Sequence, residues 1–481
     1  MKKLLIIFVV LSVMLVSCAK FDDINVSPIA LSEPTTRGLL TNAIQALPSL
    51  TLGNTAISRN GSLYVQFLSE GPYPGPSLYS DRNAAFADWY IGPLYNLVKI
   101  IEYNTDNSPY ADPSTNGASA NQVAVARILK AYLFLQMTDR WGDLPYFDAL
   151  QGAAAFAPAY DKQQDIYTDL FKELKEANDQ IQVAEKGAVG DILMNGDMAA
   201  WKRFANTTRM IMALRLSKVD AAKGKTEYAA ALADGVITDN SQNVYYQFIA
   251  GDPNNYNPWY NNYTISLRND YAISNTLADY MSAKNDPRLK VYAETLPNGT
   301  IKGLPYGKNA AVNIPAAFSR IGDPFRGAGS KLNIYSYAQV LFMEAEAAKI
   351  GYTAGGDAEA QIKYYSAIEN SWKEFGVFND AAFGIYTALP SVAYSPTTGY
   401  QQIMTEKWVA MYLKGWESWN DWRRTDFPTL IPAADGVDAR GIPTRLGYPT
   451  AEASLNGDNY KAAVAAIGGS DHNYVKLWWD K

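Results

Sequence analysis

Cysteine and histidine are nearly absent from this chain. Its 481 residues include one cysteine, Cys18, and one histidine, His472. A disulfide, a thiolate metal site or a cysteine nucleophile would need cysteines that the chain lacks beyond Cys18. Serine–histidine catalysis could use only His472, and a histidine-rich zinc site would need more histidines than the chain contains. The composition therefore argues against the commonest catalytic and metal-binding mechanisms, and we predict no cofactor.

An excess of positive charge is missing as well. The chain has 42 lysines and arginines against 48 aspartates and glutamates, which gives a formal charge of −6. No run of basic residues interrupts this balance. Binding to nucleic acid needs clustered lysine and arginine side chains against the phosphates. Nucleic acid is therefore not predicted as a partner.

Long apolar segments are missing too, and the one short segment stands at the N-terminus. Residues 4–16 follow Lys2 and Lys3 and are apolar except for Ser12, a segment that is too short for a membrane span but typical of a secretory signal. This segment ends in Leu-Val-Ser-Cys, the pattern of a bacterial lipobox. We predict a signal peptide over residues 1–17, lipidation of Cys18 and a tether over residues 18–35, so that lipid alone holds the protein on the membrane. The alternative is a plain signal peptide with an incidental cysteine.

Apolar residues at helical spacing dominate the remaining chain. Ala124, Ile128, Ala131 and Leu135 lie on one stripe of a helix predicted over residues 121–139. Other helices are predicted over 199–219, 333–350 and 401–414, with weaker windows at 36–47, 84–103, 163–184, 225–238, 272–283 and 357–375. Strand patterns are short and scarce, as at 244–248. The pattern predicts a mostly α fold of stacked helical hairpins, like tetratricopeptide units.

Three long irregular regions interrupt the helices, at 71–82, 251–268 and 296–330. Loops of this length in a compact protein are usually functional. The first two are rich in tyrosine, and the second alternates aromatic residues with asparagines. A sugar ring stacks on an exposed aromatic face while amides bond its hydroxyl edges. The predicted ligand contacts are Tyr256, Trp259, Tyr260, Tyr263 and Asn257 in the second region, and Tyr73 and Tyr79 in the first, as an opposing wall with Asp81 and Arg82. The alternative is that these rings fix their own loops to the helical body.

Two other functions, calcium binding and glycosidase catalysis, receive little support from the sequence. Asp252, Asn254, Asn255 and Asn257 offer oxygen ligands within a few positions, but the segment lacks the glycine and the distal glutamate of a calcium loop. A structural calcium ion is therefore possible but unsupported. Glu344 and Glu346 are two positions apart on a predicted helix and point in different directions, so they do not form a glycosidase pair. We predict that the protein is not an enzyme.

Several sequence blocks, in a fixed order, resemble one family. After the lipobox come Phe-Asp-Asp-Ile-Asn at 21–25 and the block 131–146, which ends in Thr-Asp-Arg-Trp-Gly-Asp-Leu-Pro-Tyr. Further blocks lie at 201–215, 286–288, 337–347, 406–425, 443–449 and 477–480, and 422–425 reads Trp-Arg-Arg-Thr. The chain resembles the SusD/RagB-like family of outer-membrane nutrient-binding lipoproteins, in the branch with a WRRT-like C-terminal motif. We interpret the tryptophans and arginines of residues 416–425 as structural, with arginine–glutamate pairs between helices.

The resemblance implies a single domain over residues 36–481, with about four tetratricopeptide-like helix pairs and long loops on one side. It also implies an outer-membrane lipoprotein that faces the cell exterior and delivers its ligand to a SusC-like TonB-dependent barrel. The ligand implied is an oligosaccharide in most cases and a peptide in some. A surface-anchored glycan-degrading enzyme is one further alternative, and it would require two carboxylates facing one pocket. A purely structural role in a cell-envelope assembly is another, and it would leave the second irregular region without a pocket.

Overall fold

The computed structural model describes residues 34–51, 56–80, 83–309, 314 and 316–481. Residues 36–481 form one compact unit. The predicted signal peptide, Cys18, nearly all of the tether and the pair Asp81 and Arg82 lie outside the described residues. Among the helices described, none is long and apolar enough to cross a membrane.

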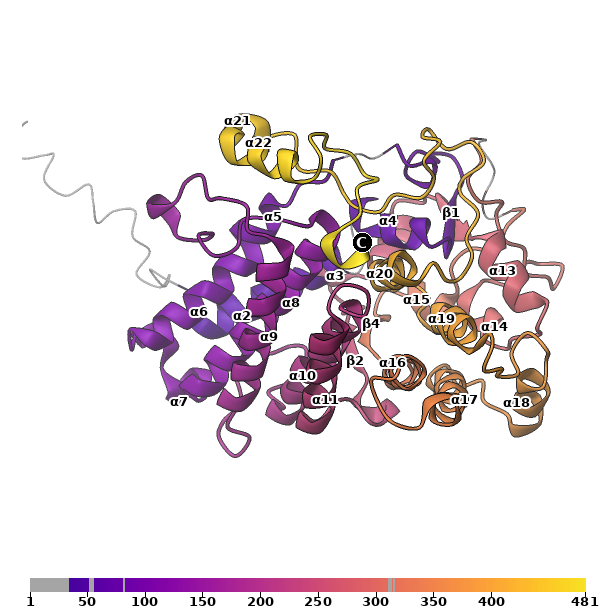
Figure 1. Cartoon of the computed structure of the whole chain (residues 1–481), viewed down its shortest axis with the longest axis horizontal. Coiled ribbons are helices and arrows are strands. Elements are labelled where there is room, and N and C mark those ends of the chain that lie inside the picture. The colour runs from indigo at the N-terminus through magenta and orange to yellow at the C-terminus, as the bar shows by residue number, and fades with distance from the viewer. Residues whose placement is uncertain (1–33, 52–55, 81–82, 310–313, 315) are drawn as a thin grey trace, which may run out of the picture. The chain divides into compact units, whose positions relative to one another are not determined.

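Helices make up most of the unit, and the four strands among its described residues are short (Figure 1). The longer helices are α2 (Thr36–Gln45), α4 (Ala56–Tyr64), α6 (Tyr95–Thr105), α8 (Ser119–Trp141), α9 (Gln163–Gln180), α10 (Met198–Arg215), α11 (Ala221–Asp234), α13 (Asn275–Ser282), α16 (Tyr337–Lys349), α17 (Gly356–Glu374), α18 (Asp380–Thr387), α19 (Gly399–Ala410), α20 (Gly415–Thr425) and α22 (Gly457–Ala466). The shorter α-helices are α3 (Leu47–Thr51), α5 (Ala87–Trp89), α7 (Pro113–Asn116), α12 (Pro258–Tyr260), α14 (Leu289–Tyr292), α15 (Asp323–Arg326) and α21 (Glu452–Leu455). Single turns of 3-10 or π type are η1 (Pro76–Leu78), η2 (Tyr90–Leu94), η3 (Pro109–Ala111), η4 (Gly152–Ala154), η5 (Asn240–Gln242), η6 (Pro253–Asn255), η7 (Asn261–Ile265) and η8 (Trp478–Asp480).

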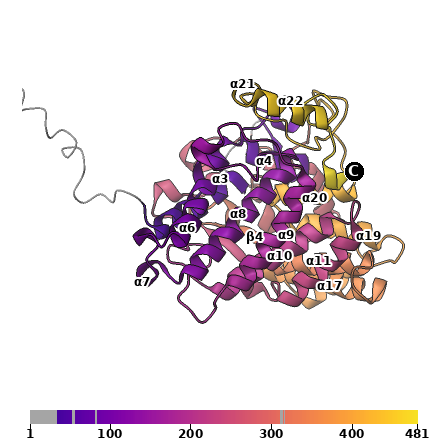
Figure 2. The ribbon, with the colours of Figure 1, turned by 60° about the vertical axis from the view of Figure 1, so that its left-hand side comes forward.

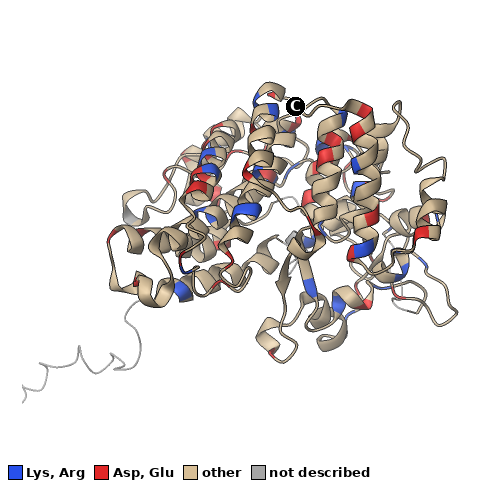
Figure 3. Cartoon of the chain, turned by 90° about the horizontal axis from the view of Figure 1, so that it is seen from below, with Lys and Arg blue, Asp and Glu red and all other residues tan. Residues whose placement is uncertain are grey.

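Consecutive helices pack as pairs, which confirms the prediction of a mostly α fold built from helical hairpins. The pairs are α8 with α9, α10 with α11, and α16 with α17, and α19 packs against both members of the last pair. Seen from below, helices of the chain carry lysine, arginine, aspartate and glutamate interspersed along their lengths (Figure 3). In both Figure 1 and Figure 2, α21 and α22 project from one edge of the unit.

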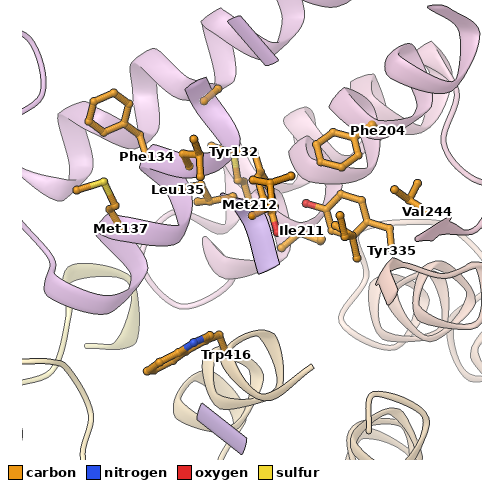
Figure 4. Packing of buried hydrophobic residues seen from close by; sticks show 14 of the residues in the cluster. Tyr132, Phe134, Leu135, Met137, Phe204, Ile211, Met212, Val244, Tyr335 and Trp416 are labelled. Atoms are coloured by element: carbon orange, nitrogen blue, oxygen red, sulfur yellow. The ribbon is translucent and has the colours of Figure 1, made fainter. Parts of the chain in front are cut away.

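The central helix α8 is buried on nearly all sides. Its predicted apolar stripe is only part of the contact surface, because α6, α9 and α10 all pack against it. Figure 4 shows Tyr132 and Leu135 of α8 beside Ile211 and Met212 of α10. The helix ends where Gly142 adopts a φ of 85° and its N–H donates to the Thr138 carbonyl at 2.8 Å. Glycine adopts this conformation without strain, so the helix ends where the sequence places Gly142.

The four strands form two antiparallel ribbons. β1 (Leu68–Glu70) pairs with β3 (Tyr271–Ile273), and β2 (Val244–Gln247) pairs with β4 (Lys331–Tyr335). The prediction that a helix begins at residue 333 was therefore wrong, because residues 331–335 form a strand and α16 begins at Tyr337. The ring of Tyr335 packs against Phe204, with centroids 4.9 Å apart. Pairing with a distant strand has overridden the local helical pattern there.

Buried ion pairs hold the helices to one another. Arg424 of α20 pairs with Glu346 of α16, and both side chains are almost completely buried. Arg215 of α10 pairs with Asp139 of α8 in the same way. The guanidinium of Arg423 lies 3.6 Å from the Trp419 ring centre. These contacts confirm the structural interpretation of residues 416–425.

Candidate ligand-binding site

The β1–β3 ribbon brings the first two irregular regions together. Residues 71–80 leave β1, and residues 251–268 lead into β3. The Gly71 N–H donates to the Asp270 carbonyl at 2.8 Å. The Arg268 guanidinium lies 5.5 Å from the centre of the Tyr73 ring. The two predicted walls therefore begin at one ribbon, as the pairing of β1 with β3 requires.

Two aromatic residues of the second region are buried. Trp259 is 3% exposed and Tyr263 is 5% exposed. The Arg59 guanidinium covers the Trp259 ring at 4.8 Å, and the Tyr263 hydroxyl donates to the Tyr271 carbonyl at 2.7 Å. The prediction that these two rings face a ligand was wrong in this structure. Burying a large ring stabilises the fold by a few kcal/mol, so these side chains fix their loop to the body.

The polar residues of that region serve its own turns. Asn257 is fully buried; its side chain accepts from the Trp259 N–H at 2.8 Å and donates to the Phe325 carbonyl at 3.0 Å. Asp252 accepts from the Asn254 N–H at 3.0 Å. The prediction of Asn257 as a ligand contact was therefore wrong, because its amide caps α12. Within the described part of the chain, no group of three histidine, cysteine, aspartate or glutamate side chains is placed to hold a metal ion.

The first irregular region contains one exposed and one buried tyrosine. Tyr73 is 67% exposed. Tyr79 is 2% exposed, and its hydroxyl accepts from the Ala433 N–H at 2.9 Å. Burial raises the pKa of the Tyr79 hydroxyl, which keeps it neutral as a hydrogen-bonding group. Tyr79 thus supports a wall and offers little ring surface, which corrects the prediction of a stacking contact.

Three predicted contacts keep accessible surface. They are Tyr73, Tyr256 and Tyr260, and the last two are partly exposed with their rings 5.1 Å apart at a steep angle. Rings in this edge-to-face arrangement present one open face and one edge. The exposed aromatic surface of the two loops is therefore smaller than the sequence predicts.

A second feature lies where the first region meets the C-terminal part of the chain. A cleft of about 370 Å³, here called the C-terminal cleft, is lined by Tyr79 and Asn83 on one side. The other lining residues are Asp438, Arg440, Ser470, Asp471, His472, Asn473 and Tyr474. Nearly all of these side chains carry hydrogen-bonding groups. The cleft is therefore polar, unlike the apolar pockets that hold most drug-sized ligands.

Ion pairs fix the charged groups of this cleft. The Arg440 guanidinium bonds Asp438, with Nη2 and Oδ2 2.6 Å apart, and lies 4.3 Å from the centre of the Tyr474 ring. Asp471 pairs with buried Arg445 at 2.7 Å. Asp438 and Asp471 are therefore each paired with a different arginine. These ion pairs hold the charged donors and acceptors of the cleft wall in place.

His472 is held in one tautomer. Its Nδ1 accepts from the Tyr474 N–H at 3.1 Å, so the neutral ring carries its proton on Nε2. Burial lowers the pKa of this imidazole, and the positive charges of Arg440 and Arg445 lower it further. The ring is therefore neutral at neutral pH and has one donor available. The sequence analysis does not predict that residues 438–474 line a binding site. The one signal for it is the polar cluster Asp-His-Asn-Tyr at 471–474, which follows Gly468 and Gly469.

The comparisons with known proteins agree with the fold. Residues 28–449 match the model of a SusD-like family described as starch-binding and associating with the outer membrane. The chain therefore belongs to this family, as its resemblance implies. No curated protein sequence matches the chain.

Solved structures share the architecture over nearly the whole chain. A structure named as a chitin-binding protein is 28% identical, with a TM-score of 0.79, and the match covers 93% of this chain and all of the other. A chitin-binding SusD homologue from Flavobacterium johnsoniae is 23% identical with a TM-score of 0.75, covering 93% and 98%. A SusD homologue from Bacteroides fragilis is 21% identical with a TM-score of 0.79, covering 93% and 100%. The last two show the fold alone.

Proposed function

We propose that the protein is a lipoprotein, anchored through Cys18 on the outer face of the outer membrane, that binds an oligosaccharide in its C-terminal cleft. It delivers this ligand to a SusC-like TonB-dependent barrel. The observation that carries the proposal is the composition of the cleft, where amides, paired carboxylates, a guanidinium and the Tyr474 ring line one hollow. Family membership and the similar chitin-binding protein support the class of ligand.

The lining fits a neutral polyol better than an apolar molecule. Sugar hydroxyls both donate and accept, and Asn83, Arg440 and His472 offer groups of both kinds at fixed positions. The paired charges cancel each other, so a neutral ligand gains hydrogen bonds without displacing a counter-charge. Tyr73, Tyr256 and Tyr260 are proposed as additional contacts for longer chains.

The arrangement supports binding more than catalysis. Asp438 and Asp471 line the same cleft, as a glycosidase pair would, but each carboxylate is held by an arginine. A general acid needs a carboxyl group that keeps its proton near neutral pH. Asp438 and Asp471 instead bond the guanidinium groups of Arg440 and Arg445, so neither carboxylate is positioned to give a proton to a ligand.

Titration calorimetry with chito-oligosaccharides and malto-oligosaccharides tests the proposal. Arg440→Ala removes a lining donor and should weaken binding of a trisaccharide about tenfold. Arg320→Ala is the matched control, because Arg320 also pairs with a carboxylate, Glu294 at 2.7 Å, also lies over a tyrosine ring, Tyr263, and does not line the C-terminal cleft. We expect no change for the control. Equal affinity of wild type and Arg440→Ala for every glycan that binds would contradict the assignment to this cleft.

An oligopeptide is the second candidate ligand. The specific observation in its favour is that the cleft holds charges of both signs, which suit the charged ends of a short peptide. A tripeptide that binds more tightly than any glycan, and loses affinity in Arg440→Ala, would favour this alternative.

A further inference from the structure

An apolar groove of about 510 Å³ lies beside α21, at the edge of the unit (Figure 1). We call it the α21 groove. It is formed by η2, by residues 145–158 after α8, and by α21, and it shares no lining residue with the C-terminal cleft. Its volume and its mainly apolar lining are those of small-molecule sites.

Large apolar side chains of the α21 groove are open to solvent. Ile91 is 75% exposed, Phe156 is 86% exposed and Leu455 is 74% exposed. They come from three separate segments of the chain and line the same hollow. Single exposed apolar residues are common, but a group of them around one hollow is typical of a surface that binds another molecule. A ligand in the groove can contact all three directly.

Hydrogen bonds hold the walls of the α21 groove in place. On one side, the Tyr90 hydroxyl of η2 donates to the Pro145 carbonyl at 2.5 Å. On the other side, Asn456 Nδ2 at the end of α21 donates to the Pro158 carbonyl at 2.8 Å. Contacts within the protein therefore preform the hollow, which lowers the cost of ordering its walls when a ligand binds.

Glu452 is the one charged residue among the described residues that line the α21 groove. Its Oε2 accepts from the Tyr160 hydroxyl at 2.7 Å. Within the described part of the chain, its Oε1 accepts no hydrogen bond and its carboxylate forms no ion pair, and the side chain is partly exposed. A carboxylate on the wall of an apolar hollow attracts a cation more strongly than it would in bulk water.

The charges at the α21 groove favour a cation over an anion. Partial burial raises the pKa of the Tyr90 hydroxyl group, and the negative charge of Glu452 raises it further, so this charge acts on the groove wall. The ammonium group of Lys99 lies 5.5 Å from the centre of the Tyr95 ring, but it pairs with Glu102 at 2.6 Å. Its charge is therefore already balanced. A cationic ligand would bring the counter-charge that Glu452 lacks.

We infer that the α21 groove binds a small apolar molecule that carries one cationic group. The ammonium group of this ligand bonds Glu452 Oε1, and its apolar body lies against Ile91, Phe156 and Leu455. The exposed apolar side chains are then covered, and the carboxylate gains a counter-charge. This site is separate from the C-terminal cleft, takes a different class of ligand and does not depend on the function proposed for that cleft.

Three probes of one shape but different charge test the site. They are 4-phenylbutylamine, which is cationic at neutral pH, 4-phenylbutan-1-ol, which is neutral, and 4-phenylbutyrate, which is anionic. The chain used starts at residue 18 and carries Cys18→Ser, so that neither lipid nor detergent competes for the groove. Ligand-observed NMR and titration calorimetry measure binding. We expect the amine to bind about tenfold more tightly than the alcohol, and the carboxylate to bind more weakly than both.

Glu452→Gln tests the charge of the carboxylate and keeps an acceptor for the Tyr160 hydroxyl. This variant should lose about tenfold in affinity for the amine and none for the alcohol. Asp169→Asn is the matched control, because Asp169 is also partly exposed and also accepts from a tyrosine hydroxyl, that of Tyr146 at 2.7 Å, but does not line the groove. The control should bind the amine like wild type.

Phe156→Ser tests the apolar contact. Because Phe156 is largely exposed, its replacement should leave the melting temperature of the protein nearly unchanged. The variant should bind both the amine and the alcohol severalfold more weakly, since both lose the same apolar contact. Melting curves of all variants check that each of them is folded.

Three binding results would overturn the inference: no binding of the amine, equal affinities for the amine and the carboxylate, or unchanged amine affinity in Glu452→Gln or Phe156→Ser. A dimer that sedimentation detects and Phe156→Ser dissociates would overturn it too, because a second copy of the chain would then cover the groove. Arg440→Ala should leave amine binding unchanged. None of these results would affect the oligosaccharide test of the C-terminal cleft.

Discussion

Arg440 lies over the ring of Tyr474, with the guanidinium carbon 4.3 Å from the ring centre, while Asp438 holds the guanidinium by two hydrogen bonds of 2.9 and 2.6 Å. Three side chains from two separate segments thus contact one another at the wall of the C-terminal cleft. Their charges are already neutralised within that group. The cleft can therefore bind a neutral ligand through hydrogen bonds and ring contact alone.

This geometry predicts that glycan affinity is insensitive to salt. Raising the salt concentration from about 0.1 M to about 1 M shortens the screening length from about 10 Å to about 3 Å, which weakens contacts with charged ligands and leaves neutral ones nearly unchanged. Calorimetry at both concentrations measures the effect. A charged tripeptide serves as the comparison, and a glycan affinity that falls as steeply as that of the peptide would contradict the neutral-ligand model.

Trp259→Ala should lower stability more than it lowers binding. Trp259 is buried beneath Arg59 and 5.5 Å from the Tyr271 ring, so truncation leaves a cavity that costs about 3–5 kcal/mol. Denaturant unfolding gives the free-energy difference. Tyr256→Ala, at a partly exposed position of the same loop, is the control and should cost far less. Equal stability of the two variants would show that Trp259 does not fix the loop.

Glu346→Ala should be strongly destabilising. It removes the closer carboxylate partner of the buried Arg424 guanidinium and leaves only Asp421, 3.2 Å away, which costs about 3–5 kcal/mol. Replacing Glu346 by Met and Arg424 by Leu together should recover much of this loss, since apolar pairs of similar volume pack well in such places. The exposed pair Lys461 and Asp458 is the control, and Lys461→Ala should have no measurable effect. If the double variant is no more stable than Glu346→Ala, charge burial is not the cause.

His472 should make the protein less stable in mild acid. Its pKa in the folded protein lies below the ordinary value of about 6.5, so the unfolded chain binds a proton more readily. The contribution is fully present above about pH 6.5 and is lost as the pH falls through the lowered folded pKa. Urea unfolding of wild type and His472→Gln at pH 7.5 and pH 5.5 measures it. We expect the free energy of unfolding to fall more for wild type than for the variant between pH 7.5 and pH 5.5. Equal decreases would show that His472 does not cause the loss of stability.

The local sequence pattern predicts the helices closely, but it does not predict the residues of the C-terminal cleft. The helix predicted over 357–375 is α17 at 356–374, because an apolar stripe and a glycine start are local signals. The local pattern predicts a helix from residue 333, although residues 331–335 are a strand, because their partner, β2, lies far away in the sequence. In the same way, Tyr79 and Ala433 are 354 positions apart, so no local pattern shows that their segments form one cleft wall. Periodicity also cannot tell an aromatic residue that fixes a loop, such as Trp259, from one that faces solvent, such as Tyr73.

The indole of Trp479 in η8 donates to the Asp139 carboxylate of α8 at 2.9 Å, across 340 positions, in the part of the core where Arg215 and Arg423 also converge. Asp139 therefore acquires its full set of partners only when residue 479 is in place. Contacts between positions so distant slow folding, because a long loop must close first. A chain still emerging from the ribosome would thus hold this charged centre only half assembled until residue 479 arrives.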